Sequence, residues 1–256
     1  MTLLLEAAVF SVQDALKAES LGASRVEFNA PGSYPQGGLT PPKTDVQELS
    51  SKISVPMRIM IRPRGPPSGD LPDFIYSLPE MEEMQYSIRE LKAANVMKPE
   101  RGDAFVFGIL KEQPDSDSPS GTSFTIDEDS SKALINLASP IPCVFHRAFD
   151  PIASSSQWQA GLDTLTRCGF VGVLTAGGKQ GKYYDNTARL LELCEHAKNN
   201  IQIIAGGGVR SQNISGPAQQ LAPFGTDNVW VHTAAFSDDQ TLDATELENI
   251  ISKLRV

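Results

Sequence analysis

The sequence predicts a single-domain α/β barrel of the TIM type, with eight parallel strands that alternate with eight helices. Short apolar runs recur along the chain, and a segment with helical periodicity follows each of them. Strand–helix alternation implies parallel strands joined by right-handed crossovers. A count of eight favours a closed barrel, and a doubly wound open sheet is the alternative. No linker divides residues 1–256, so one domain is expected.

The first half of the chain supplies four of these units. Ser11 has the residue type and position of a helix N-cap, and Gly22 ends the helical stripe that follows it. Residues 111–125 are polar and rich in Ser, Asp and Pro, which predicts a surface loop. The expected strands are 3–9, 25–29, 55–61 and 103–110, and the expected helices are 11–22, 43–53, 80–96 and 126–138.

In the second half, two apolar runs end in consecutive glycines, at 171–178 and at 201–209. An apolar run bounded by glycine fits a strand buried on both faces. Glycine lets the backbone turn tightly and approach a ligand, and a helix that starts just afterwards presents its positive end. We therefore expect an anion pocket held by Thr175, Gly177, Gly178, Gly206, Gly207 and Gly208, although such glycines can also do no more than turn a strand into a helix.

The remaining strands are expected at 142–149 and 227–235. Helices are expected at 155–168, 187–198, 211–221 and 244–254.

The composition restricts the class of partner. A formal net charge of −9 argues against a nucleic-acid surface, and no apolar run reaches the length of about 18 residues that a membrane span needs. Three cysteines without close spacing suit a reducing compartment, which predicts a cytoplasmic protein. A small anionic ligand stays compatible with the acidic chain, because a pocket can be locally positive.

Polar residues near the carboxyl ends of the strands should converge if the barrel closes. Glu6, Glu27 and His146 are candidates for acid–base chemistry, or equally for a buried ion-pair network. Arg58 shares a strand face with Arg62, so it would need a buried carboxylate such as Glu6 or Glu27. The polar residues near strand ends are Glu6, Glu27, Asn29, Arg62, His146, Arg147, Thr175 and His232.

Arg62 and two further residues, Arg64 and Asp150, lie just beyond the expected strands. Arg62 and Arg64 flank Pro63, which restricts the backbone and would hold both guanidinium groups near the mouth of the barrel. They would bind an anionic ligand or anchor a loop. Asp150 would orient His146 or Arg147, or cap the next helix.

Eight stretches, LEAAVFS, RVEFN, GGLTPP, MIRPRG, FVFGIL, VFHRAFD, LTAGG and IIAGGGVR, together resemble the strand-end motifs of the CutC copper homeostasis family. The resemblance covers most of the chain. It implies a cytoplasmic TIM barrel connected with copper handling, and it allows a homo-oligomer. Copper is implied as a ligand by this resemblance alone.

Two positions depart from the family pattern where copper matters most. The family's first two strands carry cysteines, the proposed Cu(I) ligands, where this chain has Ala8 and Asn29. Since Cu(I) selects soft thiolates, Ala8 and Asn29 count against direct Cu(I) binding, and Cys143 with a nearby Met stays open as an alternative pair of ligands. Three functions stay open: a copper homeostasis protein with an anion-compatible pocket, an acid–base isomerase, lyase or hydrolase acting on a small anionic or phosphorylated metabolite, and an inactive barrel scaffold.

Overall fold

The chain folds into a closed barrel of eight parallel strands, which confirms the predicted TIM architecture. In the computed structural model, residues 2–69, 72–115, 121–178, 182–237 and 241–255 are described. Around the barrel the strands follow the order β1, β10, β9, β8, β7, β4, β3, β2. The barrel strands are β1 (Leu4–Val9), β2 (Arg25–Phe28), β3 (Met57–Met60), β4 (Ala104–Phe107), β7 (Cys143–Phe145), β8 (Gly172–Thr175), β9 (Gln202–Gly206) and β10 (Val229–Thr233).

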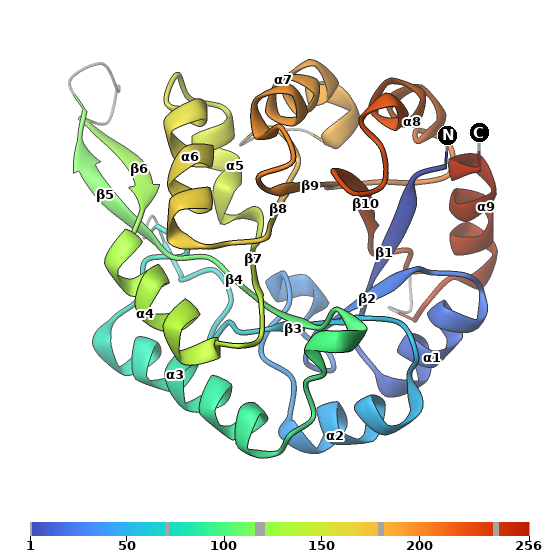
Figure 1. Ribbon diagram of the computed structural model, residues 1–256, viewed down its shortest axis with the longest axis horizontal. Helices are drawn as coiled ribbons and strands as arrows, with labels where there is room; N and C mark the ends of the chain where they lie inside the picture. The colour runs from blue at the N-terminus through green and yellow to red at the C-terminus, as the bar shows by residue number, and fades with distance from the viewer. Residues whose placement is uncertain (1, 70–71, 116–120, 179–181, 238–240, 256) are drawn as a thin grey trace.

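Helices form the outer ring around the strands (Figure 1). Local sequence sets their ends: the Ser11 side chain accepts the N–H of Asp14 at 3.0 Å, and Glu80 accepts the N–H of Ser77. The helices are α1 (Val12–Ser20), α2 (Lys43–Lys52), α3 (Leu78–Ala93), α4 (Glu128–Ala138), α5 (Asp150–Ala153), α6 (Trp158–Cys168), α7 (Thr187–Ala197), α8 (Ser215–Leu221) and α9 (Ala244–Leu254).

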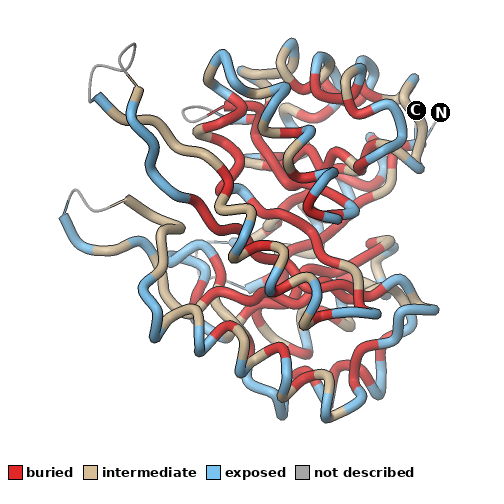
Figure 2. The backbone as a smooth tube through the Cα atoms, turned by 60° about the vertical axis from the view of Figure 1, so that its left-hand side comes forward, coloured by how far each residue is buried: buried red, intermediate tan, exposed pale blue. Residues whose placement is uncertain are grey.

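The core has two parts, because alternate residues of each strand face opposite sides of the sheet. The outward residues pack against the inner faces of the helices, so burial follows the strands and one side of each helix (Figure 2). The inward residues form a smaller cluster in the barrel, built from Met60, Ala104, Val106, Val144, Leu174 and Ile204 with Trp230 against it. This cluster fills the middle of the barrel and leaves polar groups to its ends.

The prediction that residues 111–125 lack regular secondary structure is wrong, because the segment contributes to an antiparallel hairpin. Strands β5 (Leu110–Pro114) and β6 (Thr122–Ile126) pair with each other and not with the barrel. The hairpin projects beside α6 (Figure 1). Four of the five β5 residues are exposed, so hydrophobic periodicity could not reveal the strand.

The strand expected at 142–149 ends earlier, at Phe145. Residues Arg147–Phe149 form a 3-10 turn that leads into α5, and Pro151 occupies the start of that helix, where proline is favoured. The alternation of strand faces therefore stops at His146. As a result, both His146 and Arg147 reach the same cavity.

Candidate active site

A cavity of about 580 Å³ opens at the carboxyl ends of the barrel strands. This is the end where TIM barrels build their active sites. Of the residues singled out in the sequence, those that line the cavity are Ala8, Glu27, Arg62, His146, Arg147, Asp150, Gly207, Gly208 and His232.

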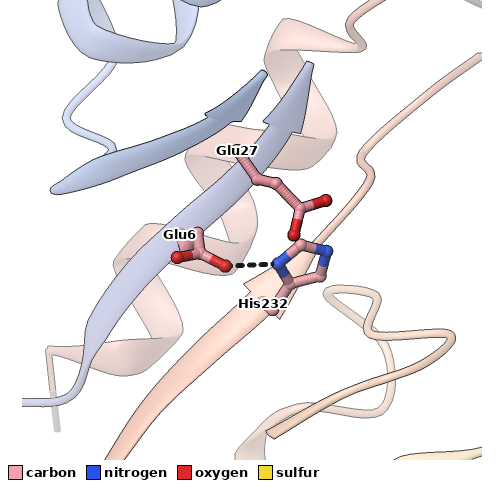
Figure 3. Close-up of side chains that lie close together, drawn as sticks. All are labelled: Glu6, Glu27 and His232. Atoms are coloured by element: carbon pink, nitrogen blue, oxygen red, sulfur yellow. Dashed lines mark hydrogen bonds and ion pairs between the residues drawn. The ribbon is translucent and has the colours of Figure 1, made fainter. Parts of the chain in front are cut away.

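Glu6 and His232 meet below the cavity, where β10 closes the barrel against β1. Oε1 of Glu6 lies 2.7 Å from Nδ1 of His232, and Oε2 lies 2.5 Å from Nε of Arg25. The side chains of Glu6, Glu27 and His232 point toward one another from three neighbouring strands (Figure 3). Glu6 therefore holds the His232 ring from beneath and does not itself line the cavity.

The charges around Glu6 keep it ionised. Burial by itself would raise the pKa of Glu6, but Arg25, His232 and Arg58 together lower that pKa to about 2. The expected partner was Arg58, and this expectation is wrong: Arg25 forms the ion pair, because Glu6 lies opposite Arg25 in the strand register. Burial and the charge of Arg25 lower the pKa of Arg58 to about 9.

Glu27 differs from Glu6 because, within the described residues, it has no cation within ion-pair distance. Its side chain accepts one long hydrogen bond of 3.4 Å from Nδ2 of Asn29. Burial, aided by the charge of Glu6, raises the pKa of Glu27. Burial opposes protonation of His232, but the carboxylates of Glu27 and Glu6 outweigh it and raise the pKa of that ring. Glu27 and His232 thus place two titratable groups with raised pKa values side by side in the cavity wall.

His146 is a neutral imidazole on the other side of the cavity. Its Nδ1 accepts the N–H of Ala148 at 3.2 Å. Burial, with the charges of Arg62 and Arg147, lowers the pKa of His146 to about 3. Nε2 is buried and has no hydrogen-bond partner in the described part of the chain.

The two arginines around Pro63 serve mainly to anchor loops. Arg62 donates to the carbonyl of Gln36 at 2.8 Å and to Oδ2 of Asp73 at 2.9 Å, although its side chain still reaches the cavity wall. Arg64 pairs with Glu80 at 2.5 Å and donates to the carbonyl of Ile75 at 2.8 Å. Arg64 does not line the cavity, so it is not placed to bind an anion there, as was expected from the sequence.

Asp150 connects the ends of β7 and β8. Its Oδ1 accepts from Thr175 Oγ1 at 2.7 Å and from the N–H of Ala176 at 2.8 Å. Its Oδ2 accepts from Nε of Arg147 at 2.8 Å, so Asp150 orients Arg147 and not His146. Burial raises the pKa of Asp150 against the influence of Arg147. Thr175 in turn accepts the N–H of Gly177, and it lies behind the wall of the cavity.

The two glycine turns do not converge as expected. Gly207 and Gly208 line the cavity, and a side chain at Gly207 would lie 2.9 Å from Ala176 and 3.4 Å from the Arg147 guanidinium. The φ of +110° at Gly207 also favours glycine. Gly206 instead packs against Leu174 and His232.

Gly177 and Gly178 line a different cavity, of about 590 Å³, beside α7. Its other lining residues include Asp185, Arg189 and Glu192. The two glycine turns therefore line separate cavities and do not form the one anion pocket that was expected. An anion in the barrel cavity would contact Arg147 and the backbone of Gly207 and Gly208.

The donor set at the site does not suit Cu(I). Among the described residues, one group of three or more His, Cys, Asp and Glu side chains has ligand atoms within 4.8 Å of one another, and it consists of Glu6, Glu27 and His232. It contains no thiolate, the ligand that Cu(I) selects, and Arg25 already neutralises Glu6. All three cysteines are buried: Cys143 on β7, Cys168 on α6 and Cys194 on α7. Burial raises the pKa of both Cys143 and Cys194 to about 12.

Arg25 and Phe74 are among the residues of the site that were not identified from the sequence. Arg25 shares a strand face with Glu27, so period-two alternation could have indicated that it points into the barrel. Phe74 covers His146 with ring centroids 4.8 Å apart and lies in the Pro- and Gly-rich segment after β3. Nothing in the sequence near Phe74 marks it as a wall of the cavity.

Comparison with known proteins agrees with the motifs. The CutC family profile matches residues 3–235. The human copper homeostasis protein cutC homolog is 34% identical over 211 residues, which are 82% of this chain and 67% of the relative. The CutC family protein of Treponema denticola is 32% identical over 82% of this chain and 74% of its own length.

Comparison with solved structures also finds a CutC protein. A crystal structure of CutC from Streptococcus agalactiae superposes with a TM-score of 0.74 at 26% identity, over 91% of this chain and 100% of that one. Phosphoribosyl anthranilate isomerase of Thermotoga maritima shares the barrel at a TM-score of 0.57 and 13% identity, over 99% and 98% of the two chains, a likeness of fold alone. None of the described helices has the length and apolar character that crossing a bilayer requires. The chain belongs to the CutC family.

Proposed function

We propose that this CutC-family protein is an acid–base enzyme that acts on a small anionic metabolite bound at the mouth of the barrel. The observation that carries this proposal is the state of Glu27. It is a buried carboxyl in the cavity wall, its pKa is raised by burial, and it faces His232. A carboxyl and an imidazole with shifted pKa values in one cavity are typical of proton-transfer sites.

The two members of the pair take different roles. Glu27, once ionised, accepts a proton from the substrate, and His232 in its protonated form donates one. Glu6 is a positioning residue, because its hydrogen bond to Nδ1 directs the opposite nitrogen of the ring away from Glu6. This arrangement uses an ion-paired carboxylate to orient a histidine, as in many catalytic dyads.

The anionic end of the substrate would contact Arg147. Its side chain is 45% exposed and is held beside Gly207 by Asp150. Because Asp150 and Asp73 offset the charges of Arg147 and Arg62, the site favours a ligand with a single anionic group over a highly charged one. The net charge of these four side chains at the site is therefore less positive than the sequence motifs suggested.

Copper homeostasis is the function that the relatives' names give. Ala8 lies in the cavity wall and Asn29 donates to Glu27, so neither position offers a thiolate. We therefore propose that this protein affects copper homeostasis indirectly, through the reaction that it catalyses, and not by binding copper. The third alternative, an inactive scaffold, predicts that Glu27 can be replaced without consequence.

The test compares the wild-type protein with Glu27→Gln in a deproteinised extract of small metabolites, followed by mass spectrometry. We expect a compound that the wild type consumes and the variant leaves intact. The matched control is Glu90→Gln, which removes an exposed carboxylate paired with Lys43 on the outer surface. Equal consumption by all three proteins, or none by any of them, would contradict the proposal.

A further inference from the structure

The side chain of His146 has an unusual hydrogen-bonding state. Since Nδ1 accepts the N–H of Ala148, the single proton of the neutral ring is on Nε2. Nε2 is buried, and no described residue accepts a hydrogen bond from it. Buried donors in folded proteins are nearly always paired, so an unpaired one in a cavity wall points to a ligand.

The surroundings of His146 hold this donor in place. The ring of Phe74 lies over His146. The guanidinium carbon of Arg62 lies 4.9 Å from the centre of the Phe74 ring. Phe74 has a φ of +65°, a conformation that a bulky residue adopts only when its neighbours impose it. Strained residues of this kind concentrate at ligand sites.

His146 and Glu27 lie on nearly opposite sides of the cavity. His146 follows β7 and Glu27 is on β2, and β3 and β4 lie between them around the eight-stranded ring. Both side chains contribute to the wall of the same cavity. A substrate between them would meet a hydrogen-bond donor on one side and a carboxylate base on the other.

We propose that the substrate is a carbonyl compound with a hydrogen on the carbon next to the carbonyl. In this assignment, which rests on the proposed acid–base function, Nε2–H of His146 binds the carbonyl oxygen and Glu27 removes the adjacent proton. His146 keeps its own proton, because a buried neutral imidazole is a hydrogen-bond donor and a very weak acid.

The step balances without a further reactant. The carbon–hydrogen bond breaks, its proton goes to the Glu27 carboxylate, and its electron pair forms a carbon–carbon double bond. The carbonyl π pair moves to oxygen, and the resulting enolate oxygen accepts the hydrogen bond from His146. Return of the proton from Glu27 to the same carbon completes an exchange. Where that carbon carries a hydroxyl group, return of the proton to the former carbonyl carbon completes an isomerisation: the hydroxyl oxygen becomes the new carbonyl oxygen, and its proton passes to the enolate oxygen.

A leaving-group reaction fits His146 less well. Departure of an alcohol, amine or hydroxide requires an acid that releases its proton near neutral pH. His146 cannot do so, since burial and neighbouring arginines keep the ring neutral, and such a reaction would use His232 as its acid and leave the His146 donor without a role. The donor is instead suited to an oxyanion that forms and disappears in place.

The first experiment measures binding of phosphoglycolohydroxamate, a planar mimic of an enolate that carries a phosphate, against ethyl phosphate, which has the anion alone. In protein labelled with ¹⁵N at histidine, the hydroxamate should move the Nε2–H signal of His146 downfield, and ethyl phosphate should not. His146→Leu should weaken hydroxamate binding about 10²–10³-fold, the usual effect of losing one oxyanion donor. His146→Gln, which keeps an N–H, should restore part of it.

Equal responses to the two probes, or no response to either, would overturn the carbonyl assignment. The wild-type NMR measurement keeps the test valid if a variant fails to fold. A second experiment separates this failure from that of the proposed function. In D₂O, suppose that consumption of a metabolite depends on Glu27, but that its product has neither deuterium beside a carbonyl nor a hydrogen moved to the neighbouring carbon. This result overturns the carbonyl assignment and leaves the acid–base function standing.

Discussion

Oε1 of Glu6 on β1 lies 2.7 Å from Nδ1 of His232 on β10, at the seam where the last barrel strand pairs with the first. The contact joins residues that are 226 positions apart in the chain. Closure of the barrel therefore creates the oriented histidine, and any change to Glu6 should be detected at His232.

The variant Glu6→Gln should lower the pKa of His232. Burial already opposes protonation of this ring, and Glu6 is one of the two carboxylates that counteract it. Titration of the His232 ring by NMR gives the midpoint directly. The surface variant Glu90→Gln should leave the midpoint in place, and an unchanged midpoint in Glu6→Gln would show that Glu27 alone sets it.

Glu6 should also stabilise the fold in a pH-dependent way. Its folded-state pKa of about 2 is below its ordinary value of 4.5, so its contribution is fully present above pH 4.5 and is lost as the pH falls toward 2. Urea unfolding of the wild type and Glu6→Gln should therefore give free energies that converge over this window. A difference that is constant from pH 6 to pH 3 would contradict the predicted shift.

Removal of Arg25 should be far more damaging than removal of a surface cation. Its side chain is 3% exposed and its partner Glu6 is 2% exposed. Arg25→Met leaves the buried Glu6 carboxylate without its arginine and with His232 as its remaining partner, which costs about 3–5 kcal/mol in the free energy of unfolding. Lys43→Met, which breaks the exposed pair with Glu90, should leave the free energy of unfolding nearly unchanged. Similar losses from both variants would show that Arg25 contributes little.

Cu(I) should not bind stoichiometrically to the reduced wild-type protein, and the double variant Ala8→Cys with Asn29→Cys should gain Cu(I) binding. Both positions lie at adjoining strand ends, since the N–H of Asn29 donates to the carbonyl of Val9 at 3.0 Å. Two thiolates would supply the soft ligands that Cu(I) prefers. Competition with a chromophoric Cu(I) chelator measures the gain, and the matching double serine variant is the control. Strong binding by the wild type would contradict the prediction.

The fold and much of the site were predictable because the signals are local. Each barrel strand is an apolar run of its own, and a closed barrel places all carboxyl ends on one rim. Glu27, His146 and His232 could therefore be assigned to one cavity from their positions in the strands. Asp150 was expected to orient a neighbour, and the structure shows that the neighbour is Arg147.

The remaining features depend on distances that the sequence does not contain. Whether Glu6 pairs with Arg25 or Arg58 is decided by strand register, and both arginines face the barrel interior. The two glycine turns follow neighbouring strands, yet Gly177 turns toward Asn186 and α7 whereas Gly207 turns toward Arg147. The unpaired Nε2 of His146 depends on the short 3-10 turn that brings the N–H of Ala148 to Nδ1.

Two backbone hydrogen bonds hold the base of the hairpin formed by β5 and β6 against the barrel. The N–H of Leu110 donates to the carbonyl of Phe74 at 2.9 Å, and the N–H of Asp127 donates to the carbonyl of Ile109 at 3.0 Å. These two hydrogen bonds fix the points where the hairpin leaves and rejoins the barrel. The bond from Leu110 also holds Phe74, the residue that covers His146. Insertions or deletions farther out along the hairpin can thus accumulate without moving the cavity wall, whereas a change at its root would be transmitted to Phe74.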